Sequence, residues 1–557
     1  MPKKNILKDF FTFREPRVEP GFVLAWDEPE ELAGTKKKEE KFLDERYVFR
    51  PGRTLSGRIR EDVGVFRDAF SGNPNNLEIR EYQVAGKKVA ALYLVHAVNN
   101  GVISGDILEK IPQSKDAALE SIARSLTAGT VDILAEFNRG LEELLQGHAV
   151  ILADGEKRFV SALAKSAVHR QVKEPISERV IKGPQEGFVE DLDINLALVR
   201  KRLRTHRLMI EETMVGSLSR TRCAILSLAG ITNPRLLAEV KRRINGIKLD
   251  FLFDSGMLEQ MIEDNTFFLH PQIYTIERPD RVAAGLAEGK VAVLADGSNL
   301  ALMMPANLIG FLHAAEDYSV RWPFGVYMRL IRVLSLFVIL FLPSLYVAAT
   351  LFQPEFLPTD ILFSLVAIKQ KAPLPTFLDI LLLEFVFEII REAGIRSPQH
   401  LATPFIIVTG VFIGLASVFT CIINPVLLIV ITITGIGAFT LPEFSIALSY
   451  RLAKYFYLIM AFLFGYIGIA FGAYLHLHML VSQKSFGVPM LTPIAPITRR
   501  SGDIVLMRPV WARTKRPDIT DPSQEGRKPE ASRIWLDEQQ EKPTAPEGGG
   551  EKDDQGR

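Results

Sequence analysis

The sequence predicts an α/β soluble N-terminal domain made of two tandem similar subdomains, followed by an all-α multi-span membrane domain. Three observations support this fold class. Charge is scarce between Gly325 and Val481, where eight Lys/Arg and seven Asp/Glu are spread over 157 residues. This block contains four long uncharged apolar runs, and the chain before it repeats a helix-then-strand pattern. The block from Gly325 to Val481 is therefore suited to an apolar environment such as a lipid bilayer, unlike the rest of the chain.

The composition excludes several classes of protein. Of the 557 residues 48% are hydrophobic and 24% charged, which does not fit a disordered or collagen-like chain. The formal net charge is +1, so no bulk positive charge attracts nucleic acid, and we expect no nucleic-acid partner. The two cysteines, Cys223 and Cys421, provide neither a disulfide framework nor a four-cysteine metal site.

Two pairs of similar segments indicate an internal repeat in the α/β half. Residues 137–155 resemble residues 279–297, because both carry an Arg, a Leu, a Gly before an apolar strand, and the end LADG. Upstream of each lies an apolar strand that leads into a polar turn, at 89–100 and at 223–233. The long period predicts two α/β subdomains rather than a solenoid. Short apolar strands that alternate with helical patterns further favour mixed or parallel sheets.

The α/β half contains no pattern typical of an enzyme. Asp154 and Asp296 end strands at Asp-Gly pairs, which either bind a ligand at a sheet edge or, more commonly, only form the turn. Phosphate-binding glycine loops, HExxH and CxxC are all missing from the sequence. His476 and His478 are two residues apart and do not share a helix face, which disfavours a metal site there. We therefore predict no enzymatic activity, no catalytic residue, no cofactor and no bound metal.

Four uncharged apolar runs predict membrane spans. They are residues 333–352, 404–423, 425–442 and 455–482. About twenty apolar residues in a helix cross the 30 Å hydrocarbon layer. Only Asn424 separates the second run from the third, which predicts a helical hairpin. The fourth run is long enough to tilt or to continue past the bilayer.

The stretch from Leu357 to Arg396 has charges among its apolar residues, so it cannot face lipid on all sides. Glu384, Glu388 and Glu392 recur every four residues, which places three carboxylates on one face of a helix. This face is either a wet interfacial surface or part of an ion pathway or an oligomer contact. The candidate ion-path or oligomer-contact residues are Glu384, Glu388, Arg391 and Glu392.

Basic residues flank the apolar block and indicate its orientation. Arg321, Arg329 and Arg332 precede the first run, and seven basic residues follow the last run up to Arg516. By the positive-inside rule both ends are cytoplasmic, although Arg451 and Lys454 fit this rule poorly if only four spans exist. The predicted segments are a disordered extension (1–45), two α/β subdomains (46–180 and 181–315), a transmembrane helical domain (316–482), a cytoplasmic C-terminal segment (483–525) and a disordered tail (526–557).

Local motifs near the junction between the soluble and the apolar parts resemble one family. These motifs are GPQEGF (183–188), NLALVRKRLR (195–204), ERPDR (277–281), LADG (294–297), AEDY (315–318), RLIR (329–332), LPSLY (342–346), FEIIREAGIRSP (387–398) and FGVPMLTPIAP (486–496). Together they resemble the A subunit of the GerA-type spore germination receptors, whose family includes the paralogue stage V sporulation protein AF.

The resemblance implies a subunit of the inner membrane of the bacterial spore, with its N-terminal domain in the cytoplasm. It also implies a transporter-like B subunit, a lipoprotein C subunit and membrane lipid as partners. It further implies a homo-oligomeric ring, such as a pentamer, that conducts cations when a nutrient is sensed. The charged residues of the junction motifs are candidates for coupling the soluble domain to the membrane domain: Glu277, Arg278, Asp280, Glu316, Asp317, Arg329 and Arg332.

Three functional hypotheses remain open at the level of the sequence. The first is an oligomeric, nutrient-gated or germination-amplifying cation channel. The second is a non-conducting signalling scaffold that relays nutrient sensing by a partner subunit. The third is a secondary transporter, which would favour inverted repeats in the membrane part, whereas the repeats seen here lie in the soluble half.

Overall fold

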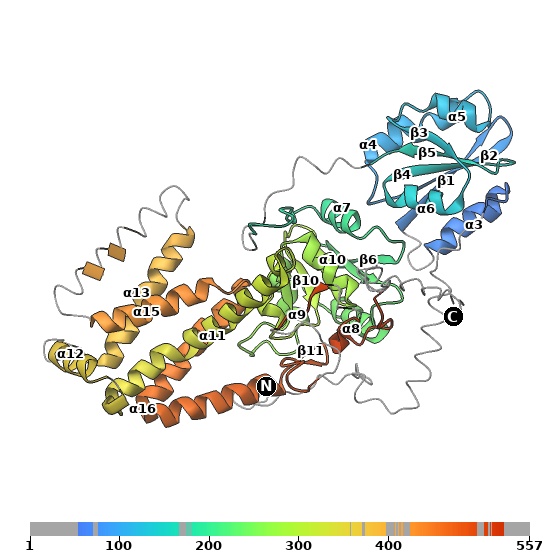
Figure 1. Ribbon diagram of the computed structural model, residues 1–557. Coiled ribbons are helices and arrows are strands. Elements are labelled where there is room, and N and C mark those ends of the chain that lie inside the picture. Colours follow the sequence, from blue (N-terminus) through green and yellow to red (C-terminus); the bar gives the residue numbers. More distant parts are fainter. Residues whose placement is uncertain are drawn as a thin grey trace, which may run out of the picture.

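The computed structural model contains two α/β units followed by a helical part (Figure 1). It describes residues 54–70, 76–165, 180–356, 358–369, 374–396, 424–497, 506–510 and 515–527, with a few isolated residues between these ranges. Most of the predicted run at 404–423, with Cys421, the extension at 1–45 and most of the tail at 526–557 lie outside the described residues. The first α/β unit lies on the far side of the second unit from the helices.

The first unit is a five-stranded sheet with the strand order β1-β2-β4-β5-β3. Alternate residues of β2 point to opposite faces, as the pleat requires: Ala91 and Tyr93 belong to one buried cluster, and Ala90 and Leu92 to the other. Both faces of the sheet are thus covered. The elements are α3 Ile59–Ala69, β1 Leu77–Val84, β2 Lys87–Leu94, α4 Asn100–Val102, η3 Ile103–Leu108, η4 Ile111–Gln113, α5 Leu119–Ser125, β3 Val131–Leu134, α6 Phe137–Leu145, β4 His148–Ala153 and β5 Phe159–Leu163.

The second unit repeats this topology with the strand order β6-β7-β9-β10-β8. One face of its sheet packs on α8 and α9, and the other face belongs to a cluster that continues into the helical part. The second unit and the helices therefore share a core. Its elements are α7 Leu192–Arg202, β6 Leu208–Val215, β7 Thr221–Leu228, α8 Pro234–Asn245, α9 Ser255–Ile262, β8 Tyr274–Ile276, α10 Pro279–Ala287, β9 Val291–Ala295, β10 Ala301–Met304, η6 Gly310–Leu312 and η7 Ala315–Tyr318.

The prediction of mixed or parallel sheets is wrong, because every strand pair in the described ranges is antiparallel. Alternation of helices and strands does not fix strand direction by itself. Here β1 and β2 are joined by a tight turn at Ala85–Gly86, and both residues have positive φ. Two neighbouring strands joined by so short a turn must run antiparallel.

The two Asp-Gly turns have equivalent structural roles in the two units. Asp154 Oδ1 accepts a hydrogen bond from the backbone N–H of Ile59, at the first residue of α3, over 3.4 Å. Asp296 Oδ1 accepts the equivalent bond from Leu192, at the first residue of α7, over 3.2 Å. A carboxylate at a helix N-terminus satisfies a free N–H group and suits the helix dipole. Each Asp therefore ties the preceding helix to its sheet.

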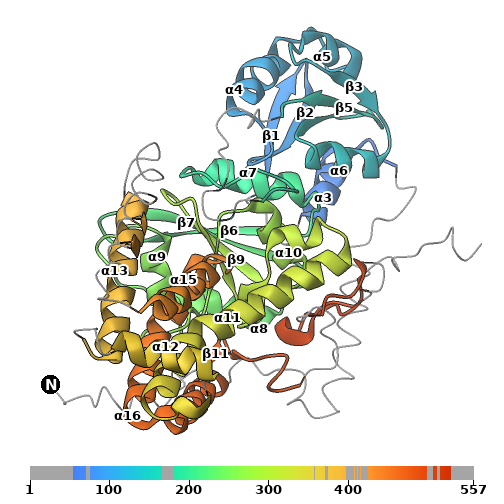
Figure 2. The same ribbon diagram turned by 60° about the vertical axis from the view of Figure 1, so that its left-hand side comes forward.

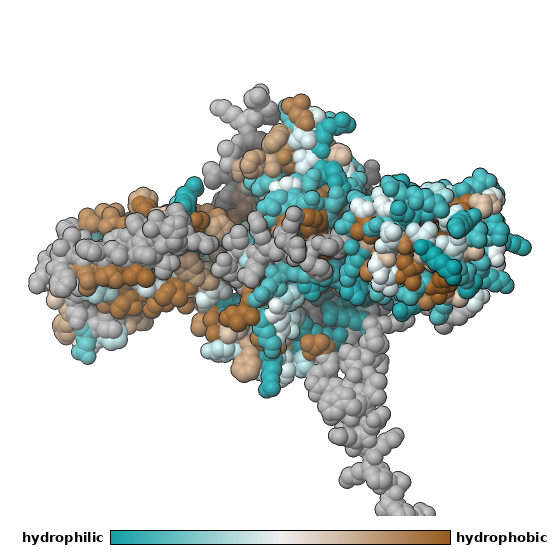
Figure 3. All heavy atoms as spheres, turned by 90° about the horizontal axis from the view of Figure 1, so that it is seen from above, coloured by the Kyte–Doolittle hydropathy of each residue, from teal (hydrophilic) through white to brown (hydrophobic). Residues whose placement is uncertain are grey.

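The helical part extends away from the second sheet, and its main helices lie side by side (Figures 1 and 2). Two helices, Trp322–Leu351 and Phe444–Ser482, are long and apolar enough to cross a membrane. Large apolar side chains are exposed along them, and Figure 3 shows the resulting apolar surface. The elements are α11 Trp322–Leu351, η8 Pro354–Phe356, α12 Thr359–Lys369, α13 Thr376–Arg396, α15 Pro425–Phe439 and α16 Phe444–Ser482.

Helix α16 doubles back on itself, which the apolar run at 455–482 did not predict. Gly465 has φ +59° and ψ −139°, outside the helical range. Tyr457 Oη and His476 Nδ1 are 3.0 Å apart, although nineteen residues separate them. In a straight helix this separation would be about 28 Å. The two halves of α16 therefore pack antiparallel, and glycine is needed at the turn because its φ is positive.

Both ends of the apolar block return to the second α/β unit. Helix α11 begins directly after η7, and α16 is followed by a short hairpin of β11 Lys484–Ser485 and β12 Val488–Pro489. In this hairpin Ser485 Oγ donates to the backbone oxygen of Gln272 over 2.6 Å. Further along the chain, Asn233 Nδ2 donates to Asp521 Oδ2 over 3.1 Å. The C-terminal segment is thus docked on the second unit.

Candidate functional site

The junction between the second unit and α11 is built on one fully buried carboxylate, Asp317. It accepts hydrogen bonds from Arg329 Nε over 3.0 Å and from Arg332 Nη1 over 2.7 Å. Arg332 also donates to the backbone oxygen of Leu312 and lies 3.5 Å from Glu316. Because two arginines of α11 share one carboxylate of η7, the first turns of α11 are fixed to the soluble unit.

The ERPDR segment (277–281) forms hydrogen bonds with the residues that precede α7 in the second unit. Arg278 is buried, and its Nη2 atom lies 2.9 Å from Asp280 Oδ2 and 2.8 Å from the backbone oxygen of Pro184. The backbone N–H of Glu277 donates to Glu178 Oε2, and its carbonyl oxygen accepts from Phe188. Glu277 and Arg278 therefore contact the segment that includes Glu178, Pro184 and Phe188, and Asp280 pairs with Arg278. The other four candidates contact one another: Glu316, Asp317, Arg329 and Arg332.

A residue that was not a candidate, Arg281, joins the same segment to α16. It forms an ion pair with Glu178 and lies 3.7 Å from Glu443, the residue before α16. Glu443 Oε1 also accepts a hydrogen bond from the backbone of Thr275 in β8 over 3.1 Å. Burial raises the pKa of Glu443 to about 8, although the nearby Arg281 opposes this rise. Arg281 is the last residue of the ERPDR motif and directly follows the candidate Asp280, and this position was the available signal in the sequence.

A pair of buried histidines forms a second link between the soluble unit and α16. His270 Nε2 and His476 Nε2 are 2.7 Å apart, and the two rings are stacked with an interplanar angle of 3°. Tyr457 contacts the other ring nitrogen of His476, and Tyr450 packs against His270. One of the two histidines must donate its N–H to the other, so the contact requires that at most one proton lies between the rings. His478 takes no part in this pair.

Two ion pairs join α13 to the first half of α16 inside the apolar block. Lys454 donates to Glu384, and the exposed fractions of these side chains are 3% and 1%. Arg451 Nη1 lies 3.0 Å from Glu388 Oε2, and Arg391 lies 3.9 Å from the other oxygen of Glu388. The guanidinium of Arg391 also covers the ring of Phe439 at 4.6 Å.

The three carboxylates on this face of α13 thus differ in their exposure to solvent. Glu384 is buried, Glu388 is 30% exposed, and Glu392 is 59% exposed and pairs with Arg396 over 2.7 Å. Only the Glu392 end has the environment of a wet surface. Two carboxylates and three cations meet in the interior, so the local charge is +1 when all five groups are ionised (Glu384, Glu388, Arg391, Arg451, Lys454).

Arg451 and Lys454 are the partners that the sequence did not assign to this face. They are three residues apart on one helix, and Glu384 and Glu388 are four apart on another. On antiparallel helices such spacings bring the pairs into register. In the ranges that the structure describes, no group of three or more His, Cys, Asp or Glu side chains is arranged to hold a metal ion.

These features define a class of protein in which two α/β units are joined, through buried charges, to a helical bundle with an apolar outer surface. A family model, that of the Bacillus/Clostridium GerA spore germination protein, matches residues 65–519. The chain belongs to this family, which confirms the family that the junction motifs predict.

Several relatives from Bacillus species are similar over most of their length. Spore germination protein KA of Bacillus subtilis (strain 168) is 33% identical over 456 residues, 80% of this chain and 84% of that protein. The uncharacterized membrane protein YfkQ of the same strain is 34% identical over 72% of this chain and 78% of its own length. Spore germination protein A1 of this strain is 31% identical over 84% of this chain and 96% of that protein. These names describe germination or membrane proteins, and none of them describes an enzyme.

One solved structure is also similar. The N-terminal domain of the A subunit of the Bacillus megaterium spore germinant receptor GerK3 is 27% identical, with a TM-score of 0.37, and covers 47% of this chain and 99% of that domain.

Proposed function

We propose that this chain is a membrane subunit of a spore germination complex and forms a homo-oligomer that conducts cations out of the dormant spore when a nutrient is sensed. Its helical part crosses the inner membrane of the spore several times, and its α/β units lie in the cytoplasm. Its partners are membrane lipid, a transporter-like B subunit and a lipoprotein C subunit. The names of its relatives and its apolar helices support this placement.

The pairing of the acidic face of α13 with α16 is the observation that carries the conduction proposal. Charged groups are costly at membrane depth and are retained there mainly for function. Glu384 and Glu388 are neutralised by Lys454 and Arg451 in this structure, so this arrangement does not attract cations. Opening then separates Glu388 from Arg451 and exposes a carboxylate to the ion path. Glu384 stays paired and holds the two helices together.

The contacts at the junction provide the route for the signal. Asp317 fixes the start of α11, whereas Glu443 and His476 fix the two ends of α16 to the second α/β unit. A movement of that unit therefore acts on both helices at once. Coupling of this kind requires a part of the structure that can adopt two states. In this proposal that part is the set of ion pairs between α13 and α16, which is closed in one state and partly separated in the other.

A second candidate is a non-conducting scaffold that relays sensing by a partner subunit. The same neutralisation of Glu384 and Glu388 favours it, because paired carboxylates serve a structural role equally well. A secondary transporter is a third candidate, without a specific observation in its favour.

Cation flux by the purified full-length protein in liposomes distinguishes these candidates. A conducting oligomer gives potassium efflux that rises linearly with the cation gradient, together with unitary current steps in planar bilayers. A transporter gives saturating flux without current steps. A scaffold gives no flux above that of protein-free liposomes even though cross-linking shows an intact oligomer, and this result would exclude conduction by the chain alone.

A further inference from the structure

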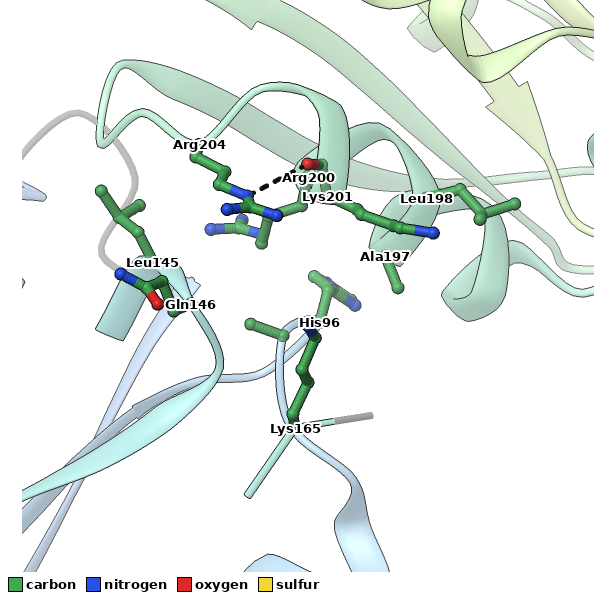
Figure 4. Close-up of a pocket in the computed structure, with 10 residues that line it drawn as sticks. His96, Leu145, Gln146, Lys165, Ala197, Leu198, Arg200, Lys201 and Arg204 are labelled. Atoms are coloured by element: carbon green, nitrogen blue, oxygen red, sulfur yellow. Dashed lines mark hydrogen bonds between the residues drawn. The ribbon is translucent and has the colours of Figure 1, made fainter. Parts of the chain in front are cut away.

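A small pocket lies between the two α/β units and is rich in positive charge (Figure 4). It has a volume of about 80 Å³. His96 and Lys165 contribute from the first unit, after β2 and β5, and Arg200 and Arg204 contribute from α7 and the residues directly after it. The residues that line the pocket include Lys201 as well, and none of them is an aspartate or a glutamate.

Arg200 is the unusual residue of this pocket, because it is buried and unpaired. Its exposed fraction is 2%, and its Nε and Nη2 atoms have no hydrogen-bond partner within the described part of the chain. Burial alone lowers the pKa of Arg200 to about 10, so it remains charged near neutral pH. A buried guanidinium without a counter-charge is unfavourable, since the loss of hydration is not compensated.

The neighbouring charges increase this imbalance. Figure 4 shows the guanidinium groups of Arg200 and Arg204 on the same side of the pocket, whereas the Lys201 side chain points away from them. Lys201 is already paired with Glu186 at 2.5 Å. Arg204 donates only to the backbone oxygen of Lys201 among the described residues.

Two carboxylates beside the pocket are paired with another arginine. Asp193 and Glu212 both lie within hydrogen-bond distance of Arg222, and His96 is 3.6 Å and 3.4 Å from them. They therefore do not neutralise Arg200 or Arg204. The positive charges of the pocket thus lack a negative counter-charge, because none of the lining residues is acidic.

We propose that this pocket binds the oxyanion group of a small ligand, a carboxylate or a phosphate, between the two α/β units. Guanidinium groups bind both of these groups with paired, charge-assisted hydrogen bonds. The volume admits such a group rather than a whole metabolite, so the rest of the ligand extends out of the pocket. Because Lys165 and Arg200 belong to different units, an anion here also holds the units together. The site is distinct from the ion pairs in the helical part and does not depend on conduction.

Binding of labelled inorganic phosphate to the purified full-length protein tests this site. Equilibrium dialysis at constant ionic strength should give about one phosphate per chain. The Arg200→Met variant should bind about 10- to 100-fold more weakly, because one charge-assisted contact is lost. Arg124→Met is the matched control, since it makes the same change at an exposed arginine of α5, and it should bind like the wild type.

Acetate distinguishes the two sources of the oxyanion. If acetate displaces phosphate at a similar concentration, the pocket accepts carboxylates as well as phosphates. If acetate does not compete, the pocket is specific for phosphate. The exposed Arg204→Gln variant replaces Arg200→Met if the latter does not fold, and it should also weaken binding. Absence of both phosphate and acetate binding, or equal binding by the wild type and both pocket variants, would overturn the proposal.

Discussion

Lys454 of α16 and Glu384 of α13 form an ion pair in which both side chains are almost completely buried. The pair lies in the apolar block, where water cannot take over the role of a missing partner. Its second carboxylate oxygen has no hydrogen-bond partner in the described ranges. Of the two ion pairs between these helices, this one is the more deeply buried. Removal of either of its charges leaves the other in an apolar interior without a counter-charge.

Glu384→Gln should destabilise the helical part by about 3–5 kcal/mol, because it leaves the Lys454 ammonium buried without a counter-charge. The double variant Glu384→Gln with Lys454→Met should recover much of this loss, since no isolated charge remains. Thermal unfolding of the full-length protein in detergent measures both effects. Glu392→Gln is the control and should change stability by less than about 1 kcal/mol, since this residue is exposed. Equal effects at residues 384 and 392 would contradict the buried pair.

Asp317→Asn should weaken the junction strongly, because Arg329 and Arg332 then share no carboxylate in a buried site. We expect proteases to cut the chain near residue 320 in this variant at concentrations that leave the wild type intact. Glu316→Gln is the neighbouring control: Glu316 is partly exposed and 3.5 Å from Arg332, so cleavage should not change. Resistance of the Asp317→Asn variant to proteolysis would show that the junction does not depend on this carboxylate.

The His270–His476 contact should make stability depend on pH. Burial, together with the neighbouring His476, lowers the pKa of His270 to about 3, compared with 6.5 for a free histidine. Between these values the unfolded chain binds a proton at His270 that the folded chain does not bind. Stability should therefore fall as pH decreases below about 6.5, by up to about 1.4 kcal/mol for each pH unit.

Thermal unfolding of the wild type and of His270→Gln between pH 7 and pH 5 measures this dependence. The variant should lose less stability than the wild type over this range, because the group that titrates has been removed. Parallel curves for the two proteins would mean that other histidines cause the whole effect.

The bend at Gly465 predicts a short distance between the two ends of α16. Leu448 and Val481 are exposed and lie on opposite halves of the helix. Spin labels at these positions should be within about 20 Å of each other, because packed helices are 8–10 Å apart. In one continuous helix they would be separated by about 50 Å. The longer distance in the membrane-embedded protein would rule out the bend.

The sequence was sufficient to predict the two repeated α/β units, but it was not sufficient to predict the direction of their strands. The repeats at 137–155 and 279–297 identify the same strand in both units because burial fixes the apolar pattern. Strand direction depends on connections such as the Ala85–Gly86 turn, and the apolar pattern does not record them. The bend at Gly465 was missed for a related reason, since both halves of α16 carry similar exposed apolar side chains.

The sequence grouped candidate residues only where they are close to one another along the chain. Asp317, Arg329 and Arg332 lie within sixteen residues of one another, and the structure brings them together. His270 and His476 are separated by 206 residues, and no local pattern relates them. Pairing of this kind is decided by the packing of whole helices, which a single sequence does not reveal.

Basal potassium flux through Arg451→Gln and Glu388→Gln proteins in liposomes tests the conduction proposal most directly, with the oligomeric state measured alongside. Because Arg451 neutralises Glu388 at 3.0 Å in this structure, Arg451→Gln should free the carboxylate and raise basal flux above that of the wild type. The double variant Arg451→Gln with Glu388→Gln should return to the level of the wild type, and Glu388→Gln alone should not exceed it. Unchanged flux in all three variants, with an intact oligomer in each, would contradict a cation path beside Glu388.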